Sequence, residues 1–425
     1  MHGHGVAGWK EDYAALITRL PSLVEAAPLT LCGMGACVDA LIAMPDLAPL
    51  LDASGSSQAV ALASVLLDRA RRGIGGEIAF DWPEGPAWLA ARVPLRFSLG
   101  GTGAQAGWTL AATGARALVA LEDRSARMLA CLEPKILLAE DGCLVEAPAV
   151  RPRGANHPEV FIFEYTAGVC IGSVVPPRSS RIIVRFDNKG LEHDADFDVL
   201  SLSLASTAGA GLVSGFNGVP PAQLDAEIRR VAAIASGWKA AGLAAIHLEL
   251  AGYDSLEACC RVMGGLRGSV GSVGMSHSEF LTLAQALLPD LAEDIGAGMV
   301  ALGEHFGFDR VCVHADHWAA AATLGEPAVE YQALMMGCLL SSARAVAGRP
   351  IRPQAIDARA DFHTPPFPVP LQAGRWTVVS CASPYLSVPA TTLGLGDSFT
   401  AGCLLALGCA AVGASPAGIC QRIPT

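Results

Sequence analysis

Short apolar segments alternate with helix-like segments along most of this 425-residue sequence, and this alternation limits the fold more than any other feature. The apolar runs predict buried strands, at 29–32, 117–121, 197–204, 244–250, 271–276, 310–314 and 376–384, and a strand end at 97–99 before a glycine turn. The segments between them predict helices, at 11–20, 57–72, 102–113, 221–238 and 330–347. Repeated strand–helix–strand units imply a parallel sheet with helices on its faces, so the sequence predicts an α/β fold.

Residues 150–195 break this alternation. The segments "EVFIFEYTAG" and "RIIVRFDNKG" are rich in strand-forming residues and are separated by Gly, Pro and Ser. A chain of this length forms either two lobes or one large domain with an insertion. We therefore expect one catalytic unit over 1–425, a β-rich insertion over 150–195 that serves as a lid, and 37–50 as a candidate second lid segment.

Composition excludes several classes of function. The net charge is −11, with 29 basic and 40 acidic residues, which argues against a nucleic-acid partner. No stretch of about 20 residues is apolar without Gly, Pro or charge, so no membrane span is expected. The N-terminus lacks the pattern of a signal peptide, and the 13 cysteines show no Cys-x-x-Cys spacing. We expect a cytoplasmic protein with reduced cysteines.

The stretch "ATTLGLGDSFTAG", residues 390–402, carries the strongest chemical signal. Its glycines lead into a helix start, where free backbone N–H groups and the helix dipole favour an anion. Gly394 and Gly396 let the backbone approach a ligand closely. Asp397 beside such an anion hole suits a base that deprotonates a hydroxyl during phosphoryl transfer. Alternatively, Asp397 is only a helix N-cap, which stabilises a helix by about 1 kcal/mol.

Other chemistry-bearing residues follow the ends of predicted strands. In open parallel sheets, ligands bind beyond the carboxyl ends of the strands. One shared site explains this recurrence better than coincidence does. The residues concerned are Asp39, Gly100, Gly101, Glu249, Glu279, His314 and Asp397.

Each of these residues also has a purely structural explanation. Glu249 could pair with a Lys or Arg in the core, and Glu279 could simply favour the dipole at a helix start. Asp39 could be a turn residue, since Asp favours such positions.

Two groups of polar residues point less clearly to function. His314 and His317 are three residues apart with no evident third ligand, so we interpret them as hydrogen-bonded histidines rather than a zinc site. Arg181, Arg185 and Lys189 lie in the β-rich segment. They could reach a substrate phosphate, although such residues more often form a solvated hairpin face.

From about residue 31 to about residue 410, the sequence resembles the ADP-dependent glucokinase and phosphofructokinase family of the ribokinase-like superfamily. "TTLGLGDSFTAG" resembles the family's Gly-x-Gly-Asp segment. The resemblance implies that Asp397 is the catalytic base and that Gly394, Leu395 and Gly396, with the following amides, form the anion hole. The residues ahead of this turn, Thr392 among them, would form part of the adenine pocket.

Three further segments resemble the nucleotide and metal side of the family's site. "IHLELAG" is similar to the His-x-Glu motif, which implies that Glu249 helps to organise a Mg²⁺ ion. "SVGMSHSEF" is similar to the Asn-x-x-Glu segment, with Glu279 at the acid and Ser276 at the Asn position. "RVCVHADHW" resembles the strand that lines the nucleotide side, which places His314 there.

The acceptor side departs from the family pattern. Relatives carry Asn-x-Asn-x-Asp after the first strand, whereas this chain has Gly35 and Cys37 at the two Asn positions and keeps Asp39. The pair Gly100 and Gly101, which contacts the sugar in relatives, is also kept. Because a site that hydrogen-bonds its substrate discriminates strongly, the acceptor is expected to differ from glucose and fructose 6-phosphate.

The resemblance implies a ribokinase-like three-layer α/β/α sandwich, with a central mostly parallel sheet and a smaller β-rich lid. It implies Mg²⁺-dependent transfer from ADP to a hydroxyl of a sugar or sugar phosphate, by a monomer or small homo-oligomer. One alternative is an ATP-dependent ribokinase-type sugar or nucleoside kinase, whose usual Asp-Thr-x-Gly-Ala-Gly-Asp segment differs from "ATTLGLGD" here. The other alternative is a non-catalytic sugar- or nucleotide-binding relative.

Overall fold

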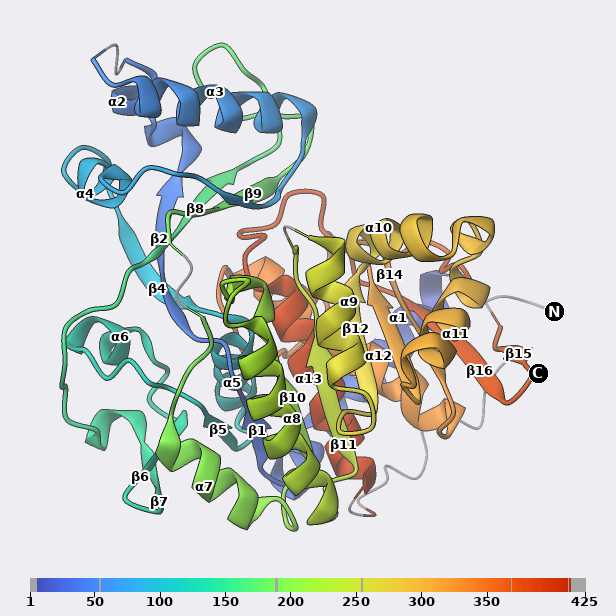
Figure 1. Ribbon diagram of the computed structural model, residues 1–425. Helices are drawn as coiled ribbons and strands as arrows, with labels where there is room; N and C mark the ends of the chain where they lie inside the picture. The colour runs from blue at the N-terminus through green and yellow to red at the C-terminus, as the bar shows by residue number, and fades with distance from the viewer. Residues whose placement is uncertain are drawn as a thin grey trace.

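The protein's structure, a computed structural model, describes residues 6–52, 55–187, 190–253, 255–367, 369–411 and 413. These residues form two separate β-sheets, one of eleven strands and one of five. Figure 1 shows the smaller sheet and its helices at the upper left, and below it the larger sheet, which runs from β6 and β7 at the lower left to β15 and β16 at the right.

The larger sheet has the order β15-β16-β14-β13-β12-β11-β10-β1-β5-β6-β7. Its central strands are parallel: β1 Thr30–Cys32, β5 Ala117–Val119, β6 Leu137–Glu140, β10 Ala210–Val213, β11 Ala245–Glu249, β12 Ser272–Ser276 and β13 Arg310–His314. Antiparallel strands extend both margins: β7 Cys143–Glu146, β14 Trp318–Thr323, β15 Leu371–Ala373 and β16 Trp376–Ala382. The carboxyl ends of the parallel strands therefore meet along one edge.

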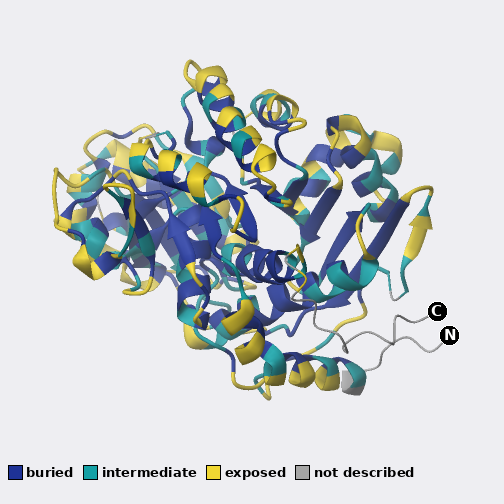
Figure 2. Cartoon of the chain, turned by 90° about the horizontal axis from the view of Figure 1, so that it is seen from below, coloured by how far each residue is buried: buried dark blue, intermediate teal, exposed yellow. Residues whose placement is uncertain are grey.

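Helices cover both faces of the larger sheet, and Figure 2 shows its strands as a buried layer between them. One face packs against α1 Val6–Ala26, α5 Thr102–Thr113, α12 Pro327–Ala347 and α13 Leu395–Ala411. The other packs against α7 Ala195–Leu204, α8 Leu224–Ala240, α9 Leu256–Gly265, α10 His277–Leu287 and α11 Ile295–Phe306. This arrangement confirms the predicted α/β/α layers. No helix in the described part of the chain combines the length and apolarity needed to cross a bilayer.

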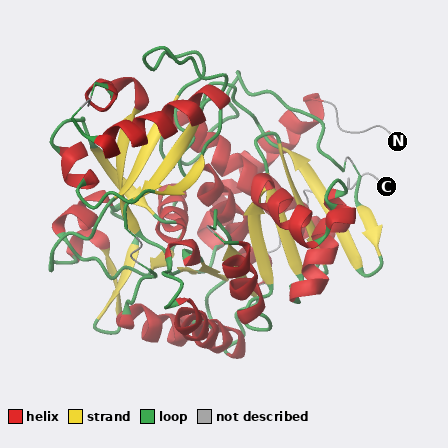
Figure 3. Ribbon diagram, turned by 45° about the horizontal axis from the view of Figure 1, so that its top comes forward, coloured by secondary structure: helices red, strands yellow, loops and turns green. Residues whose placement is uncertain are grey.

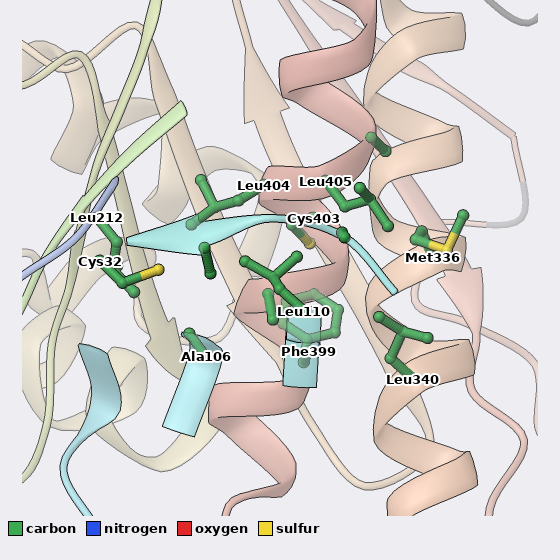
Figure 4. Close-up of a cluster of buried hydrophobic side chains, with 14 of the residues drawn as sticks. Cys32, Ala106, Leu110, Leu212, Met336, Leu340, Phe399, Cys403, Leu404 and Leu405 are labelled. Atoms are coloured by element: carbon green, nitrogen blue, oxygen red, sulfur yellow. The ribbon is translucent and has the colours of Figure 1, made fainter. Parts of the chain in front are cut away.

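Helix α13 lies in the most deeply buried helix layer, against α12 and α5. In Figure 4, Phe399, Cys403, Leu404 and Leu405 of α13 lie among side chains of both neighbouring helices and of the sheet. The α12 backbone approaches so closely that a Cβ at Gly337 would lie 2.6 Å from the ring of Phe399. Such dense packing fixes the axis of α13, and with it the residues at the helix N-terminus.

The smaller sheet has the order β3-β9-β8-β2-β4. Its strands are β2 Cys37–Ala43, β3 Gly76–Ala79, β4 Arg96–Gly100, β8 Val160–Tyr165 and β9 Ser180–Arg185, and α2 Ala48–Leu51, α3 Ser57–Arg72 and α4 Gly85–Ala90 pack with it (Figure 3). Two strands thus come from the β-rich segment 150–195, and three come from residues 37–100. The use of this sheet as a lid stays a prediction.

Several predicted elements have different bounds or types. Helix α1 runs from Val6 to Ala26 with Pro21 inside it, rather than ending at residue 20. Leu16, Leu20 and Leu23 are all buried in the core beside α12 and α13, and this burial outweighs the backbone hydrogen bond that a proline removes.

The segment 197–204, predicted as a strand, belongs to helix α7. The Asp194 side chain accepts a hydrogen bond from the Phe197 backbone N–H and caps this helix. The apolar run that suggested a buried strand is not buried along its whole length, because the Val199 side chain is 69% exposed. The strand of this region is β10, which begins at Ala210.

The predicted strand–helix–strand unit over 97–121 connects the two sheets. Strand β4 pairs antiparallel with β2 in the smaller sheet, whereas β5 pairs with β1 in the larger sheet. The helix between them, α5, therefore begins where the two sheets meet.

Strand β14 was not predicted. Its sequence, "WAAAAT", has weak strand propensity, and the strand forms because it pairs along its whole length with β13 and β16.

Candidate active site

Asp397 lies in the first turn of α13, close to the junction of the two sheets. Gly394 turns the chain with φ +69°, and the backbone N–H of Ser398 donates to Gly394 O at 3.0 Å. Because α13 begins at Leu395, Asp397 is the third residue of the helix and is not its N-cap. The backbone N–H groups of Leu395, Gly396 and Asp397 precede the first intrahelical bond, so they remain available at the positive end of the helix dipole.

The Asp397 carboxylate is half-buried, and burial raises its pKa above the ordinary value. The Arg344 guanidinium opposes that rise most strongly, followed by a hydrogen bond from the Thr102 hydroxyl and by the charge of Arg181. The charge of Glu249 raises the pKa further. Asp397 is therefore a carboxylate held between two cations and a second acid.

Arg344, on α12, was not predicted from the sequence. Its guanidinium is 2% exposed and donates from Nη1 to Gln105 Oε1 at 2.7 Å and to Ser398 Oγ at 3.4 Å. It lies against the turn that precedes α13, because a Cβ at Gly394 would be 2.2 Å from Arg344 Cζ. The available signal was one arginine within the apolar helix sequence "LLSSARAVAG".

Asp39 lies within strand β2 rather than in a turn, opposite Ser98 of β4. It is buried, and burial raises its pKa to about 7. The Cys37 thiol, 3.5 Å from Oδ1, and the charges of Arg185 and Arg344 act in the opposite direction, whereas the charge of Asp397 raises the pKa. Asp39 and Asp397 therefore share one electrostatic environment, although 358 positions separate them in the sequence (397 − 39).

The glycines predicted for the acceptor side surround Asp39. A Cβ at Gly100 would lie 2.1 Å from Asp39 Oδ1. Gly101 has φ +81°, and a Cβ there would lie 2.7 Å from the Ala36 backbone. The Ala104 N–H donates to Gly35 O at 3.1 Å, so the start of α5 packs on the loop between β1 and β2. The structure thus brings Gly35, Asp39, Gly100 and Gly101 together.

Glu249, at the end of β11, is buried between two histidines. Its Oε2 lies 2.9 Å from His247 Nε2 and its Oε1 lies 3.3 Å from His314 Nε2. Burial alone would raise the pKa of Glu249, but the hydrogen bonds from His247 and His314 lower it to about 2. Burial alone would lower the pKa of His314, and Glu249 raises it to about 9. The partners of Glu249 are therefore histidines and not the Lys or Arg of the structural alternative.

Glu279 forms a capping box with Ser276 at the start of α10. The Ser276 N–H donates to Glu279 Oε2 at 2.7 Å, and the Glu279 N–H donates to Ser276 Oγ at 3.3 Å. Burial raises the pKa of Glu279, with a smaller contribution from Glu249, while the Ser276 bonds and His314 oppose this rise. The hydrogen bonds of Glu279 to described residues include none to its second carboxylate oxygen, Oε1.

The histidines of the β13–β14 region face different neighbours. His314 binds Glu249, and a Cβ at Gly396 would lie 3.1 Å from its Cε1, so His314 lies beside the helix start. His317 instead packs on His363 and Tyr385, with ring centroids 4.1 Å away in both cases. Within the described ranges, no three His, Cys, Asp or Glu side chains are grouped so as to hold a metal ion.

The smaller sheet contacts the turn before α13 through Glu164 of β8. Glu164 Oε1 accepts from Thr391 Oγ1 at 2.8 Å and from the Thr392 N–H at 3.3 Å. The Thr392 hydroxyl is buried without a hydrogen-bond partner among the described residues. The backbone of the predicted nucleotide pocket is therefore held by a residue of the other sheet.

The three basic residues that could reach a substrate phosphate, Arg181, Arg185 and Lys189, differ in their contacts. Arg185 forms an ion pair with Glu77, and Asn217 Nδ2 lies 3.1 Å from each carboxylate oxygen of that Glu77. Arg181 is half-buried, and its Nε has no hydrogen-bond partner in the described part of the chain. Lys189 lies outside the described residues.

Solved structures share this fold at low sequence identity. An ADP-dependent kinase in complex with fructose-6-phosphate and ADPbetaS has a TM-score of 0.77 and 15% identity, and the match covers 95% of this chain and 99% of that one. The last common ancestor of ADP-dependent phosphofructokinases from Methanosarcinales has a TM-score of 0.71, 15% identity and coverage of 95% and 99%. A hypothetical ADP-dependent phosphofructokinase from Pyrococcus horikoshii has a TM-score of 0.70 and 18% identity, and the match covers 90% of this chain and 98% of that one.

A search of the curated proteins finds no match. A family profile does match, described as the ADP-specific Phosphofructokinase/Glucokinase conserved region, over residues 29–406. This span contains both sheets and every residue of the candidate site, and it confirms the resemblance seen in the motifs. The chain belongs to the ADP-specific phosphofructokinase/glucokinase family.

Proposed function

We propose that this protein is a Mg²⁺-dependent kinase that transfers a phosphoryl group from ADP to a hydroxyl of a sugar or sugar phosphate, with Asp397 as general base. The observation that carries the proposal is the place of Asp397. It lies in the first turn of α13, beside the buried Arg344 and beside backbone N–H groups that have no partner among the described residues, and it shares the electrostatic environment of Asp39.

The reaction would proceed as an exchange of two P–O bonds. Asp397 takes the proton of the acceptor hydroxyl, and the acceptor oxygen bonds to the β-phosphorus of ADP while the bond to the bridging oxygen breaks. AMP leaves and a phosphorylated acceptor is formed. The N–H groups around Gly394, Leu395 and Gly396 would hold the transferring phosphoryl group, and Thr392 and His314 would lie on the nucleotide side.

The acceptor side would consist of Asp39, Gly35, Gly100 and Gly101. The half-buried Arg181 has no hydrogen-bond partner for its Nε within the described ranges, and its charge lowers the pKa of Asp397, so it suits a phosphate group on the acceptor. One structural neighbour is an ADP-dependent kinase in complex with fructose-6-phosphate and ADPbetaS, and another is a phosphofructokinase from Pyrococcus horikoshii with AMP. These ligands agree with an ADP donor, an AMP product and a phosphorylated sugar as acceptor.

The residues near Asp397 fit a magnesium ion that keeps several of its waters. Glu279 Oε1 has no hydrogen-bond partner among the described residues, whereas both oxygens of Glu249 are bonded to histidines. Mg²⁺ is commonly held by one or two carboxylates together with substrate phosphates. Glu279 would therefore hold the ion, directly or through water, and Glu249 would act through water. When bound, the ion would neutralise charge on the donor phosphates.

An acceptor screen tests the proposal. Purified protein is incubated with Mg²⁺ and either ADP or ATP against hexoses, hexose phosphates, pentoses and nucleosides, and nucleotide products are separated by chromatography. Acceptor-dependent formation of AMP from ADP is expected. Turnover with ATP alone would instead identify an ATP-dependent kinase. Binding of nucleotide and sugar in a thermal-shift assay, with no turnover across the panel, would identify a non-catalytic relative.

A further inference from the structure

Arg344 is a buried cation at the junction of three helices and the turn before α13. Its Nη1 bonds to Gln105 of α5 and to Ser398 of α13, and its guanidinium lies 5.6 Å from the ring centroid of Trp108. Ser398 Oγ is in turn 2.9 Å from Thr109 Oγ1. One side chain thus connects α12, α5 and α13 directly below the first turn that carries Asp397.

These bonds leave much of the guanidinium without hydrogen-bond partners. Among the described residues, the buried Nε has no hydrogen-bond partner, and no hydrogen bond from Nη2 is found either. An arginine that served only to join three helices would be expected to satisfy its donors, because an uncompensated buried charge is costly. The remaining compensation comes from the field of nearby carboxylates, of which Asp397 is the strongest, followed by Asp39 and Glu164.

The contact with Gly394 is as tight as the backbone allows. The position of a Cβ on Gly394 lies 2.2 Å from Cζ and 2.3 Å from Nη2 of Arg344. Gly394 also has the left-handed φ that favours glycine. The guanidinium therefore packs directly against the Gly394 turn and fixes the position of the backbone N–H groups that follow it.

We propose that Arg344 is a positioning residue of the transfer site, which holds the Gly394 turn and keeps the Asp397 carboxylate ionised and in place for proton abstraction. This inference rests on the proposed function. Arginine suits the role better than lysine, because a guanidinium keeps its charge when buried and offers planar donors to two helices at once.

Other charged and polar groups also face Asp397. They are Thr102 on α5, Arg181 on β9, Glu249 on β11 and Asp39 on β2. Arg181 lies on the smaller sheet, so Arg344 is the one of the two cations that comes from the same helix layer as Asp397. Loss of Arg344 would remove the strongest of the groups that lower the pKa of Asp397. Thr102 and Arg181 alone would then oppose burial and the charge of Glu249, so the balance would move toward the protonated form.

The test compares pH–rate profiles of the wild type, Arg344→Met and Arg344→Lys with the acceptor found in the screen. In Arg344→Met, kcat is expected to fall by about 10- to 100-fold, and the acidic limb of the kcat profile to move up by about one pH unit or more. Arg344→Lys is expected to retain the wild-type limb with a smaller loss of kcat. Guanidinium added to Arg344→Ala is expected to restore part of its activity.

A control variant separates this role from a general need for a buried arginine. Arg124→Met removes another buried guanidinium, which pairs with Asp194 at 3.0 Å. It is expected to lower the unfolding temperature and leave the acidic limb of the kcat profile unchanged.

Two outcomes overturn the inference about Arg344 alone. One is an active Arg344→Met variant whose acidic limb coincides with that of the wild type. The other, if Arg344→Met does not fold, is a folded Arg344→Ala whose acidic limb coincides with that of the wild type and whose activity is not raised by added guanidinium. Absence of turnover by the wild type with every donor and acceptor would overturn the proposed function instead.

Discussion

The carboxylate of Asp39 lies directly against the α-carbon of Gly100, so that a Cβ at position 100 would be 2.1 Å from Oδ1. These residues are diagonal neighbours in the β2–β4 pair of the smaller sheet, in which Asp39 is in register with Ser98 and Gly100 with Cys37. Glycine at position 100 is therefore required by the buried acid, independently of any contact with a ligand.

Gly100→Ala is expected to displace Asp39 or separate the two strands. Overpacking of this kind costs ~1–3 kcal/mol of unfolding free energy, and displacement of Asp39 should raise the KM for the acceptor about 10-fold or more. Urea unfolding and steady-state kinetics measure the two effects.

Gly264→Ala provides the matched control. Gly264 is an exposed residue of α9, and no heavy atom lies within 4 Å of the position its Cβ would take. This substitution is expected to stabilise the protein by ~0.5–1 kcal/mol and to leave KM unchanged. An unchanged KM in Gly100→Ala as well would show that Asp39 does not contact the acceptor.

Asp397→Asn tests the proposed base. The substitution keeps the size of the side chain and removes its ability to accept a proton, so turnover is expected to fall by about 10²–10⁴-fold. The unfolding temperature and the thermal shift produced by nucleotide should stay close to those of the wild type. Near-normal turnover would contradict the assignment of Asp397 as base.

Segments with strong local patterns were predictable from the sequence. Strands β11, β12 and β13 and helices α3 and α12 occupy the predicted positions, because a buried strand or an amphipathic helix is fixed by its own periodicity. Glu249 and His314 were placed at strand ends for the same reason. Their mutual contact, at 3.3 Å, depends on parallel strands whose order the local pattern does not encode.

The errors arose where distant contacts decide the structure. Strand β14 exists because β13 and β16 pair with its alanines, and β4 belongs to a different sheet from β5 although one short helix joins them. Arg344 and Thr102 were missed because neither belongs to a recognisable motif. Their importance comes from their contacts with Gly394 and Asp397 in the folded chain.

Asp39 should make stability depend on pH. Its pKa is raised from 3.8 to about 7 by burial, so the folded protein holds this proton more tightly than the unfolded chain does. Between these two values, rising pH ionises the unfolded form first, and the contribution of this group to the unfolding free energy falls by up to ~1.4 kcal/mol per pH unit. In Asp39→Asn this pH-dependent decrease of the unfolding free energy is absent, because the amide does not titrate.

The difference in unfolding free energy between Asp39→Asn and the wild type is therefore expected to move in favour of the variant between about pH 5 and pH 7. Urea unfolding of both proteins over this range measures it. Parallel pH dependences would mean that Asp39 is already ionised at the lower pH.

Glu279 should control the response to magnesium. Chelation with EDTA is expected to abolish turnover, and added Mg²⁺ to restore it. Glu279→Gln keeps the capping box with Ser276, since Gln also serves at that position, but removes the charge. The Mg²⁺ concentration for half-maximal turnover is expected to rise about 10-fold or more, with little change in unfolding temperature.

The matched variant Glu304→Gln, at an exposed position of α11, should respond as the wild type does. Equal Mg²⁺ requirements in both variants would exclude Glu279 from the metal site.

Glu164 should tighten nucleotide binding from the smaller sheet. Its Oε1 accepts hydrogen bonds from Thr391 Oγ1 and from the Thr392 N–H, and so fixes the turn that leads into Gly394. Hydrogen bonds to a charged group contribute ~1.5–3 kcal/mol each, and without them the turn must be ordered by the nucleotide itself. Glu164→Ala is therefore expected to raise the KM for ADP about 10-fold or more.

Thr391→Ala removes one of these two bonds and also the bond that the Leu393 N–H donates to Thr391 Oγ1 at 3.0 Å, so its KM for ADP should rise as well. The KM for the acceptor should change less than the KM for ADP in both variants, because Glu164 contacts the turn and not the residues around Asp39. Equal effects on the two KM values would instead indicate that Glu164 positions the smaller sheet as a whole, so that both substrates bind less well when its contact with the turn is lost.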